Sequence, residues 1–505
     1  MFDIKKILFY FKKNFSKKDF ILFIIIGGLF LLTRLVNLEK LPVFCDEGIY
    51  IRWAKVAWHD ATWRFISLTD GRQPLQTWAT IPFLKLFPND ALLAGRLFSV
   101  TSGLITLLGI FCLLYYLFDK KTAWTGAFLY VITPYFIFYD RIALADSAVN
   151  AGFVWILFFS ILLVRTMRLD VAIIFGLISG LALLAKSSVK MFLSLAVLAP
   201  IIVWTKNFKK SFLRLLNFLL VFTGVAALAL IIYNVQRLSP FMHYIDQKNT
   251  TFVMTVPELL KNPFAVFSHN LKTIPLYICG EMGWLIPFLG LLGLWRLSKK
   301  NFALASYLFL WILLPFMAIA FFSKVLFPRY LIFIGNLLMI LSAYFLSHLR
   351  NKKTRIVFFA FIIAVSVYYN YGIIVDPTKL AFPPIDRGQY IEGETAGWGA
   401  REIMEYSRER SNEKPVIILA EGNFGLIADV LDVFIKPGDK ISIRGYWPLD
   451  VEALYKNQAD IGNSHVYVVF SQRKTFPEFW PIKLIKKYEK PGGKTAFYLF
   501  ELQPK

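Results

Sequence analysis

Long apolar segments alternate with short polar ones along residues 20–374. A helix needs about 20 apolar residues to cross a bilayer core of roughly 30 Å, and most of these segments have about that length. We therefore predict eleven membrane-spanning helices, of which the fifth and sixth are short enough to form one re-entrant pair. The predicted spans are near 20–36, 91–118, 122–138, 147–164, 171–185, 191–204, 212–233, 274–297, 302–322, 330–349 and 356–374.

Two polar segments between the spans, 37–90 and 236–273, are too long to be simple turns. Residues 48–60 predict a helix, because Ile49, Trp53 and Val56 share one face and Arg52 and Lys55 lie on a neighbouring face. Aromatic and basic residues on separate faces are typical of a helix that lies along the membrane surface. The first outer segment is therefore expected to contain interfacial helices.

The composition changes after the last predicted span. Residues 376–384 form a proline-rich linker, and 385–505 alternate short apolar runs with turn residues. This pattern predicts a soluble α/β domain with strands near 416–420, 440–443, 466–470 and 496–501 and helices near 424–433 and 449–455. The predicted organisation is a membrane domain over 1–375, with outer loops 37–90, 139–146 and 236–273, followed by this C-terminal domain.

The composition agrees with a membrane protein. Of the 505 residues, 57% are hydrophobic and only 18% are charged, against about 25% charged in soluble domains. These values exclude a disordered chain, a fibrous repeat and a small secreted scaffold. The three cysteines are isolated in the sequence, which favours neither a disulfide framework nor a thiolate metal site.

The formal net charge of +23 first suggests a nucleic-acid partner. The basic residues, however, concentrate at the N-terminus and in alternate loops, which the positive-inside rule assigns to the cytoplasm. We therefore reject a nucleic-acid partner and predict a cytoplasmic N-terminus, an uncleaved first span and, from the odd number of spans, an extracytoplasmic C-terminal domain. These residues are Lys5, Lys6, Lys12, Lys13, Lys17, Lys18, Lys120, Lys121, Arg165, Arg168, Lys206, Lys209, Lys210, Arg296, Lys299, Lys300, Arg350, Lys352, Lys353 and Arg355.

Acidic residues at the outer ends of spans are the first candidates for chemistry, because charged groups at a membrane surface are costly unless they are paired or functional. Asp46 and Glu47 lie in the first outer segment. The alternative interpretation is that they are two solvated loop carboxylates without a chemical role. The short loop 139–146 contains two acids, Asp140 and Asp146. Arg141 lies between them in sequence and is available to pair with either acid. Asp146 precedes a span and could instead cap that helix.

Cations from three segments are predicted at the same membrane level. Arg72 precedes a proline at the start of an apolar helix, where it could face an anion or simply extend to the membrane surface. Lys186 and Lys190 lie between the fifth and sixth spans, and Arg329 with Tyr330 precedes the tenth. Such a set could hold a phosphate while leaving a carboxylate free to accept a proton.

Metal binding is a weaker interpretation. The five histidines show no HxH or HxxxH spacing. His243 and His269 share the second long outer segment and Glu281 lies near the start of the eighth span, so a divalent ion there is possible, but ordinary interfacial histidines are favoured. We therefore expect no required cofactor.

Four motifs together resemble the GT-C superfamily of membrane glycosyltransferases, most closely the protein O-mannosyltransferase and aminoarabinose-transferase (ArnT-like) group. The resemblance covers roughly residues 20–350 and implies transfer of a sugar from a polyprenyl monophosphate on the non-cytoplasmic side of a membrane, here expected to be a prokaryotic cytoplasmic membrane. The motifs are Asp46-Glu47-Gly-Ile-Tyr50, Arg72-Gln-Pro74-Leu75, Arg141-Ile-Ala-Leu-Ala-Asp146 and Pro328-Arg329-Tyr330-Leu331.

The resemblance also implies roles for single residues. Asp46 matches the acid in the base position and Asp146 the second-loop acid, while Arg72 stands where relatives usually have a phosphate-binding lysine. The ArnT-like branch has a metal-binding glutamate just before that lysine, and here the position is Gly71. This difference argues against carrying over the metal site.

The sequence therefore predicts an inverting glycosyltransferase that acts on a hydroxyl of a lipid, glycan or protein acceptor. Asp46 would be the base, with a pKa raised by its acidic neighbour, and Arg72 would meet the phosphate with Lys190 or Arg329 assisting. The candidate catalytic residues are Asp46, Glu47 and Asp146, and the candidate binding residues are Tyr50, Arg72, Arg141, Lys186, Lys190, Arg329 and Tyr330.

Two other classes compete with this interpretation: a transporter or flippase for lipid-linked sugars, and a scaffold that only binds polyprenyl phosphate. A transporter is expected to carry ionisable groups near the middle of its spans and broken helices in two related halves. Most charged groups here lie at span ends and the outer loops are asymmetric. A scaffold would keep its phosphate-binding cations but would tolerate the loss of Asp46.

Overall fold

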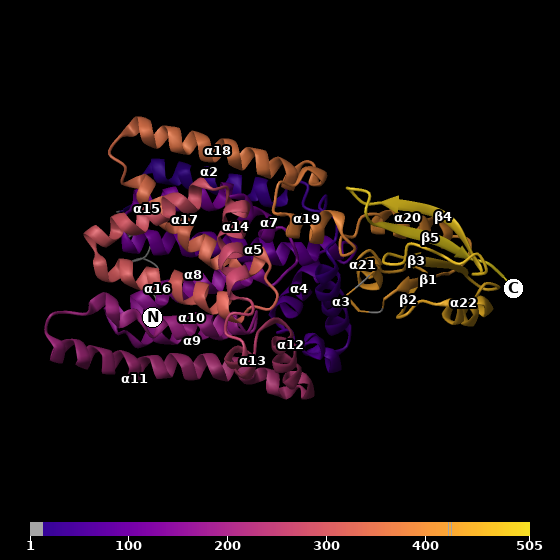
Figure 1. The fold of residues 1–505 in the computed structure, drawn as a ribbon, viewed down its shortest axis with the longest axis horizontal. Coiled ribbons are helices and arrows are strands. Elements are labelled where there is room, and N and C mark those ends of the chain that lie inside the picture. Colours follow the sequence, from indigo (N-terminus) through magenta and orange to yellow (C-terminus); the bar gives the residue numbers. More distant parts are fainter. Residues whose placement is uncertain (1–13, 423, 426, 505) are drawn as a thin grey trace.

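The computed structural model describes residues 14–422, 424–425 and 427–504. Long helices form an elongated bundle, and a separate domain built on a small sheet lies at one end of it (Figure 1). Lys5, Lys6, Lys12 and Lys13 of the predicted basic N-terminus lie outside the described residues. The predicted fold class, a polytopic helical membrane protein with a C-terminal α/β domain, is confirmed.

Each predicted span coincides with helical structure. The bundle helices are α2 (Lys17–Leu35), α5 (Ala91–Leu117), α6 (Lys120–Ile132), α7 (Pro134–Asp140), α8 (Asp146–Thr166), α9 (Leu169–Leu183), α10 (Val189–Ala196) with η3 (Ala199–Val203), α11 (Phe208–Tyr233), α14 (Phe267–Met282), α15 (Leu285–Lys300), α16 (Phe302–Phe322), η6 (Pro328–Leu331) with α17 (Ile332–Ser347), and α18 (Lys352–Ile374).

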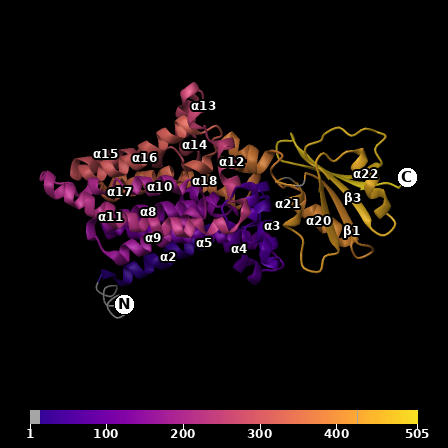
Figure 2. The ribbon, with the colours of Figure 1, turned by 90° about the horizontal axis from the view of Figure 1, so that it is seen from below.

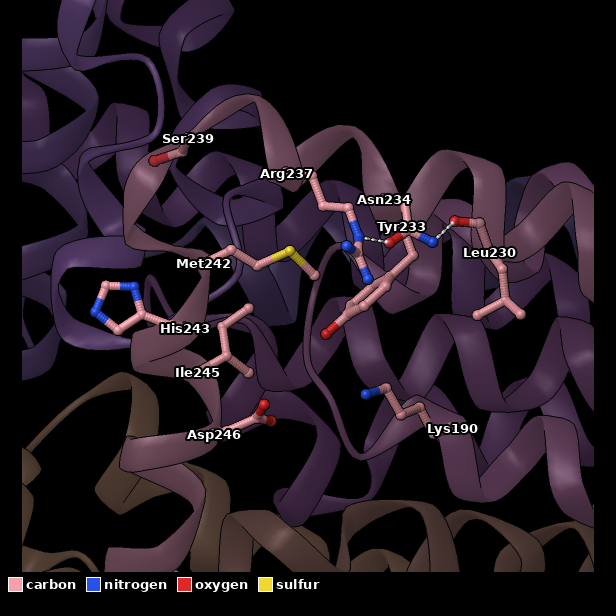
Figure 3. A pocket seen from close by; sticks show the side chains of 10 residues that line it. All are labelled: Lys190, Leu230, Tyr233, Asn234, Arg237, Ser239, Met242, His243, Ile245 and Asp246. Carbon is pink, nitrogen blue, oxygen red and sulfur yellow. Dashed lines mark hydrogen bonds between the residues drawn. The ribbon is translucent and has the colours of Figure 1, made fainter.

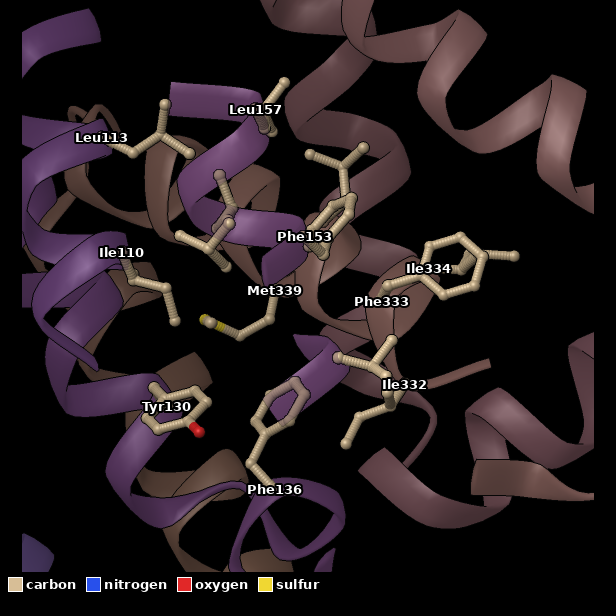
Figure 4. Close-up of a cluster of buried hydrophobic side chains, with 14 of the residues drawn as sticks. Ile110, Leu113, Tyr130, Phe136, Phe153, Leu157, Ile332, Phe333, Ile334 and Met339 are labelled. Carbon is tan, nitrogen blue, oxygen red and sulfur yellow. The ribbon is translucent and has the colours of Figure 1, made fainter. Parts of the chain in front are cut away.

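Within the described residues, six helices are long and apolar enough to cross a membrane, and the bent pair α14–α15 would make a seventh. The segments around α17 and α8 are 89% and 83% buried inside the bundle, whereas those around α11 and α18 are 22% buried. Side chains from α5, α6, α7, α8 and α17 pack together in the interior (Figure 4). The chain is therefore a multi-pass membrane protein with α8 and α17 at its centre and α11 and α18 at its periphery.

Two predicted spans are divided. The span predicted at 122–138 consists of α6 and α7, because Pro134 has no N–H to continue the helical hydrogen bonds. The span predicted at 274–297 is bent: helices α14 and α15 meet at 110°. Gly283, between them, has a φ of 72°, which lies outside the helical region and ends α14.

The two long outer segments fold into short helices at the end of the bundle nearest the sheet domain (Figure 1). The first contains the predicted helix as α3 (Cys45–His59), then η1 (Ala61–Trp63), η2 (Ile66–Asp70) and α4 (Leu75–Leu86). The second contains η4 (Asn234–Leu238), η5 (Pro240–His243), α12 (Tyr244–Phe252) and α13 (Val256–Lys261). Helix α12 packs against η2, so the two outer segments touch.

The C-terminal domain contains a five-stranded sheet in the order β2-β1-β3-β5-β4. The strands are β1 (Val416–Glu421), β2 (Ile441–Tyr446), β3 (His465–Phe470), β4 (Ile482–Glu489) and β5 (Ala496–Leu502), and the main helices are α20 (Ala400–Arg410), α21 (Ile427–Asp432) and α22 (Val451–Asn457). Strands β1, β2 and β3 are parallel to one another. Strand β5 pairs antiparallel with β3 on one side and with β4 on the other. Short elements η7 (Pro377–Lys379), α19 (Pro384–Arg387) and η8 (Gly388–Glu392) connect this domain to the bundle, and η9 (Gln458–Asp460) follows α22.

Helix α3 packs against α21 of the C-terminal domain (Figure 2). Arg52 forms an ion pair with Asp429 at 2.7 Å, and the backbone N–H of Cys45 donates to the carbonyl of Thr395 at 3.0 Å. A Cβ atom at Gly48 would lie 2.9 Å from the backbone of Asp429, so only glycine allows this approach. The basic face of this predicted interfacial helix therefore faces α21.

We expect Asp429→Asn to loosen this contact. The Asp429 carboxylate accepts from Arg52 and, at 2.7 Å, from the N–H of Gly425, so the substitution should cost about 1 kcal/mol and raise the frequency of local opening about fivefold. Hydrogen exchange of α3 and α21 in the full chain measures this opening. Asp432→Asn is the matched control, because Lys55 keeps its 2.5 Å bond to the Asp432 carbonyl. Equal protection in both variants would contradict the expectation.

A buried lysine should make the C-terminal domain sensitive to pH. Lys490 is 2% exposed, its ammonium group donates to the carbonyls of Gly393 and Glu394 at 3.1 Å, and burial lowers its pKa to about 7. The unfolded chain holds this proton up to a pH of about 10.4, so between these values the unfolded state binds more protons and stability rises with pH, by at most about 1.4 kcal/mol per pH unit.

The measurement is the protection of β4 and β5 against hydrogen exchange between pH 7 and 9, corrected for the intrinsic exchange rate. Lys490→Met should remove much of the slope, whereas Lys487→Met, at an exposed position, should leave it. The same slope in all three proteins would show that Lys490 is not its source.

Candidate active site

Asp46, in the first turn of α3, lies between two guanidinium groups. Arg72 Nη2 is 3.0 Å from Asp46 Oδ1, and Arg329 Nη2 is 3.3 Å from Asp46 Oδ2. Tyr50, one turn further along α3, lies under the Arg72 guanidinium, whose centre is 5.2 Å from the ring. Because the Asp46 side chain remains 19% exposed, this ion cluster is open to a ligand.

A second ion pair lies beside the first. Lys186 Nζ is 3.0 Å from Asp146 Oδ1, at the start of α8, and 4.4 Å from the ring of Tyr330. The charges of Asp46 and Asp146 both act on Tyr50 and on Arg329, so the two ion pairs are neighbours. The structure therefore brings two acids, three cations and two tyrosines, from five segments distant in sequence, to one place.

The charges in this cluster shift the protonation of their neighbours. Burial alone would raise the pKa of Asp46, but Arg72 and Arg329 hold it below its ordinary value. The sequence-based expectation of a raised pKa was wrong, because it considered the acidic neighbour Glu47 and not the two arginines. Burial opposes the charge of Lys186, yet Asp146 and Tyr330 raise its pKa. In this arrangement Asp46 is ionised at neutral pH.

Two linked ion pairs hold Arg72 in place. Asp70 Oδ2 accepts from Arg72 Nε at 3.0 Å, and Asp70 Oδ1 accepts from Lys248 at 2.7 Å. Gly71, with a φ of 65°, allows the chain to turn against the backbone of Tyr244 in α12. The sequence analysis missed Asp70 and Lys248, and only the unusual acid next to Gly71-Arg72 could have indicated the first of them.

Glu47, predicted as catalytic, has a different position. Its side chain is fully buried, and its two oxygens accept from Arg96 Nε and Nη2 at 2.9 Å and from the backbone N–H groups of Phe44 and Ala143 at 2.9 and 2.7 Å. These four bonds leave no oxygen for a substrate. Glu47 instead joins α3 to α5 and to the loop before α8, which fixes Asp46 relative to Asp146.

Arg141 also differs from its prediction. It pairs with neither acid: its guanidinium donates to the backbone carbonyls of Thr33, Arg34, Val36 and Asn37 at 2.7–3.0 Å, where it caps the end of α2. The carboxylate next to it, Asp140, pairs with Arg34 at 3.2 Å inside the bundle. A helix end needs such partners for its last carbonyls, which explains why this arginine is buried. Asp146 makes no capping bond.

Lys190 lies outside the ion cluster. Its ammonium group is 4.9 Å from the ring of Tyr233, and both residues line a cavity of about 600 Å³ between the starts of α10 and α12 and the end of α11 (Figure 3). The predicted role of Lys190 beside Asp46 therefore has no support from its contacts.

The residues present do not fit a metal ion. His243 Nδ1 donates to the Pro240 carbonyl at 2.9 Å, His269 contacts Thr273, and Glu281 is buried close to Asp386, so the three candidate ligands do not lie together. Among the described residues no three His, Cys, Asp or Glu side chains form a possible metal site. Asp46 and Asp146 already face cations.

Comparisons with known proteins give one family match and several structural matches. The family model described as "Dolichyl-phosphate-mannose-protein mannosyltransferase" matches residues 72–234. A search of curated protein sequences found no significant match. Among solved structures, ArnT from Cupriavidus metallidurans bound to undecaprenyl phosphate has a TM-score of 0.62 at 14% identity, covering 96% of this chain and 98% of that one.

A second structural match is more distant. The archaeal oligosaccharyltransferase AglB from Archaeoglobus fulgidus, in complex with an inhibitory peptide and a dolichol-phosphate, has a TM-score of 0.51 at 14% identity, covering 91% of this chain and 70% of that one. The fold that the sequence motifs implied is confirmed: the chain has the fold of ArnT.

Proposed function

We propose that the protein is an inverting glycosyltransferase that moves a sugar from a polyprenyl monophosphate to an acceptor hydroxyl. The observation that carries this proposal is the partly exposed Asp46 carboxylate between Arg72 and Arg329. Two guanidinium groups are suited to a phosphate, and a carboxylate at the same point is suited to accept a proton. The similar ArnT and AglB structures contain undecaprenyl phosphate and dolichol-phosphate, which supports a lipid phosphate here.

The first step is donor binding. The phosphate approaches the open side of the cluster and binds Arg72, with Arg329 and Lys186 adding positive charge. A phosphate that takes hydrogen bonds from Arg72 competes with Asp46 for that guanidinium. The ion pairs of Asp46 therefore weaken as the donor binds, and its pKa rises from the low value of the free protein. Donor binding thus makes Asp46 a better base.

The second step is transfer. The acceptor oxygen bonds to the anomeric carbon from the side opposite the phosphate, and its proton passes to Asp46. The bond between the anomeric carbon and the phosphate oxygen breaks with its electron pair on the phosphate, and polyprenyl monophosphate leaves. Arg72 and Arg329 stabilise the charge that develops on this leaving group. Asp146, held by Lys186, is placed to orient the acceptor or the sugar.

We place this site on the non-cytoplasmic side of a prokaryotic cytoplasmic membrane, together with the C-terminal domain of residues 385–505. The basic alternate loops support a cytoplasmic N-terminus, and the outer segments that carry Asp46 and Asp146 belong to the opposite set of loops. Helix α3 contacts the C-terminal domain, so that domain shares the side of the site.

The test uses purified full-length protein in proteoliposomes with a panel of labelled polyprenyl-phosphate sugars. We expect one of these donors to be consumed and polyprenyl monophosphate to be released, with the label moving to membrane components or, slowly, to water. A protein that binds polyprenyl monophosphate but consumes no member of a panel covering common neutral, acidic and amino sugars would contradict the proposal and favour a scaffold. Movement of intact donor across the bilayer would favour a flippase.

A further inference from the structure

A second set of charged side chains lies beside the ion cluster, in the cavity of about 600 Å³. Lys190 enters it from the start of α10, Tyr233 from the end of α11, Arg237 from η4 and Asp246 from α12 (Figure 3). The hydroxyl end of Tyr233 points between Lys190 and Ile245 (Figure 3). The cavity is thus bounded by Lys190 on one side and by the stretch of chain from 230 to 246 on the other.

Unlike the cations of the ion cluster, those of the cavity have no acidic partner. Among the described residues Lys190, Arg237 and Asp246 form no ion pair, and the only hydrogen bond of the Arg237 guanidinium is from Nε to Asn234 at 2.6 Å. Both terminal nitrogens of Arg237 are therefore available. Two cations against one carboxylate give the cavity a net positive charge, which favours an anion.

The cavity lies where an apolar helix surface ends. Leu230 and Leu238 are 47% and 79% exposed on the same stretch, and α11 is mostly unburied along its length. An exposed apolar helix faces lipid tails, and cations at its end lie at the level of lipid headgroups. A ligand with an anionic headgroup and an apolar tail would fit both parts of this surface.

The cavity and the proposed active site share walls. The segment after α9 gives Lys186 to the ion pair with Asp146 and, four residues later, Lys190 to the cavity. Helix α12 gives Lys248 to Asp70, which holds Arg72, and Asp246 to the cavity. A headgroup in the cavity therefore lies next to the cluster that would perform the transfer.

We propose that this cavity binds the phosphate-type headgroup of an anionic membrane lipid, at a site separate from the donor phosphate at Arg72. Arg237 would bind the phosphate through its two terminal nitrogens and Lys190 through its ammonium group, while Asp246 accepts hydrogen bonds from hydroxyls of the headgroup.

Binding experiments test this without requiring turnover. The full chain is placed in phosphatidylcholine nanodiscs containing phosphatidic acid as the simplest lipid phosphate, with polyprenyl monophosphate as a second probe, and retained lipids are counted by native mass spectrometry. We expect wild type to retain both lipids together. Lys190→Gln/Arg237→Gln should lower phosphatidic acid retention about tenfold or more and leave polyprenyl monophosphate, whereas Arg72→Gln should do the reverse.

Lys261→Gln/Lys272→Gln is the matched control, because it removes two exposed positive charges from the same outer region without touching the cavity. It should behave as wild type. Mutual exclusion of the two lipids, or loss of polyprenyl monophosphate in the cavity variant, would overturn the proposal and make the cavity part of the donor site. Undiminished phosphatidic acid in the cavity variant would also overturn it.

Free inorganic phosphate distinguishes the source of the anion. We expect millimolar phosphate to leave phosphatidic acid bound, since a soluble ion lacks the tail that lies along α11. Displacement by phosphate alone would show a site for soluble anions and overturn the lipid assignment. Loss of polyprenyl monophosphate binding only in Arg72→Gln supports the donor site independently, so failure of one proposal does not hide failure of the other.

Discussion

Replacing Asp46 with asparagine should reduce sugar transfer at least about 100-fold, because asparagine cannot accept the proton of the acceptor hydroxyl. The same change removes the carboxylate that competes with phosphate for Arg72 and Arg329. Binding of polyprenyl monophosphate should therefore be unchanged or tighter. Turnover, measured with labelled donor, should therefore fall while the affinity for polyprenyl monophosphate does not. A general loss of folding would lower both.

Asp60→Asn provides the control, because Asp60 is an exposed residue of the same outer segment and its turnover should stay within about twofold of wild type. The pH profile adds a second check. Since Arg72 and Arg329 lower the pKa of Asp46, the acid limb of kcat/KM should lie below the ordinary pKa of an aspartate side chain. Near-normal turnover of Asp46→Asn, or equal loss of turnover and binding, would remove Asp46 from the role of base.

Replacing Glu47 with glutamine should destabilise the protein by about 3–5 kcal/mol. The substitution leaves the Arg96 guanidinium, which is fully buried, without a negative partner, and it turns one acceptor into a donor facing other donors. Because Glu47 links α3 to the loop before α8, its loss should lower the free energy of unfolding. It should also change the distance between α3 and that loop. Unfolding in mild detergent, monitored by tryptophan fluorescence, measures the first effect.

Glu39→Gln makes the same chemical change in the same outer segment, in an ion pair with Arg401 that is partly exposed. Exposed pairs contribute little, so its cost should stay below about 1 kcal/mol. A Glu47→Gln protein as stable as Glu39→Gln would show that the buried pair does not hold the loops. A stable but inactive Glu47→Gln protein would return Glu47 to a direct part in the chemistry.

The sequence predicted the outer acids and cations well, because charged residues at the ends of apolar spans are costly and therefore informative. Asp46, Arg72, Asp146, Lys186 and Arg329 were all chosen in this way, and the structure places them together. The partners of each charge were not predictable. Asp70 and Lys248 are 178 residues apart, and nothing local to either residue indicates that they meet.

Two assignments failed because sequence alone does not report burial. Glu47 and Asp46 are neighbours of similar chemistry, yet helix geometry turns one into the protein interior and leaves the other at its surface. Arg141 looked like a partner for nearby acids, but the free carbonyls at the end of α2 took its hydrogen bonds. In both cases the deciding contacts come from segments distant in sequence.

The fold shows the same difference between features that the local sequence predicts and features that it does not. Apolar length located the helices, whereas the 110° bend between α14 and α15 depends on the conformation of one glycine. Strand β4 was missed because its side chains are mostly exposed and rich in lysine, a composition that protects a sheet edge and hides the alternation expected of a strand.

The configuration of the product at the anomeric carbon tests the central claim most directly. If Asp46 only takes a proton while the acceptor displaces the polyprenyl phosphate in one step, the sugar must change its anomeric configuration. Nuclear magnetic resonance of the first product formed from a donor of known configuration should show this inversion. Retained configuration would mean that the sugar first bonds to the protein, and it would contradict the assignment of Asp46 as a base.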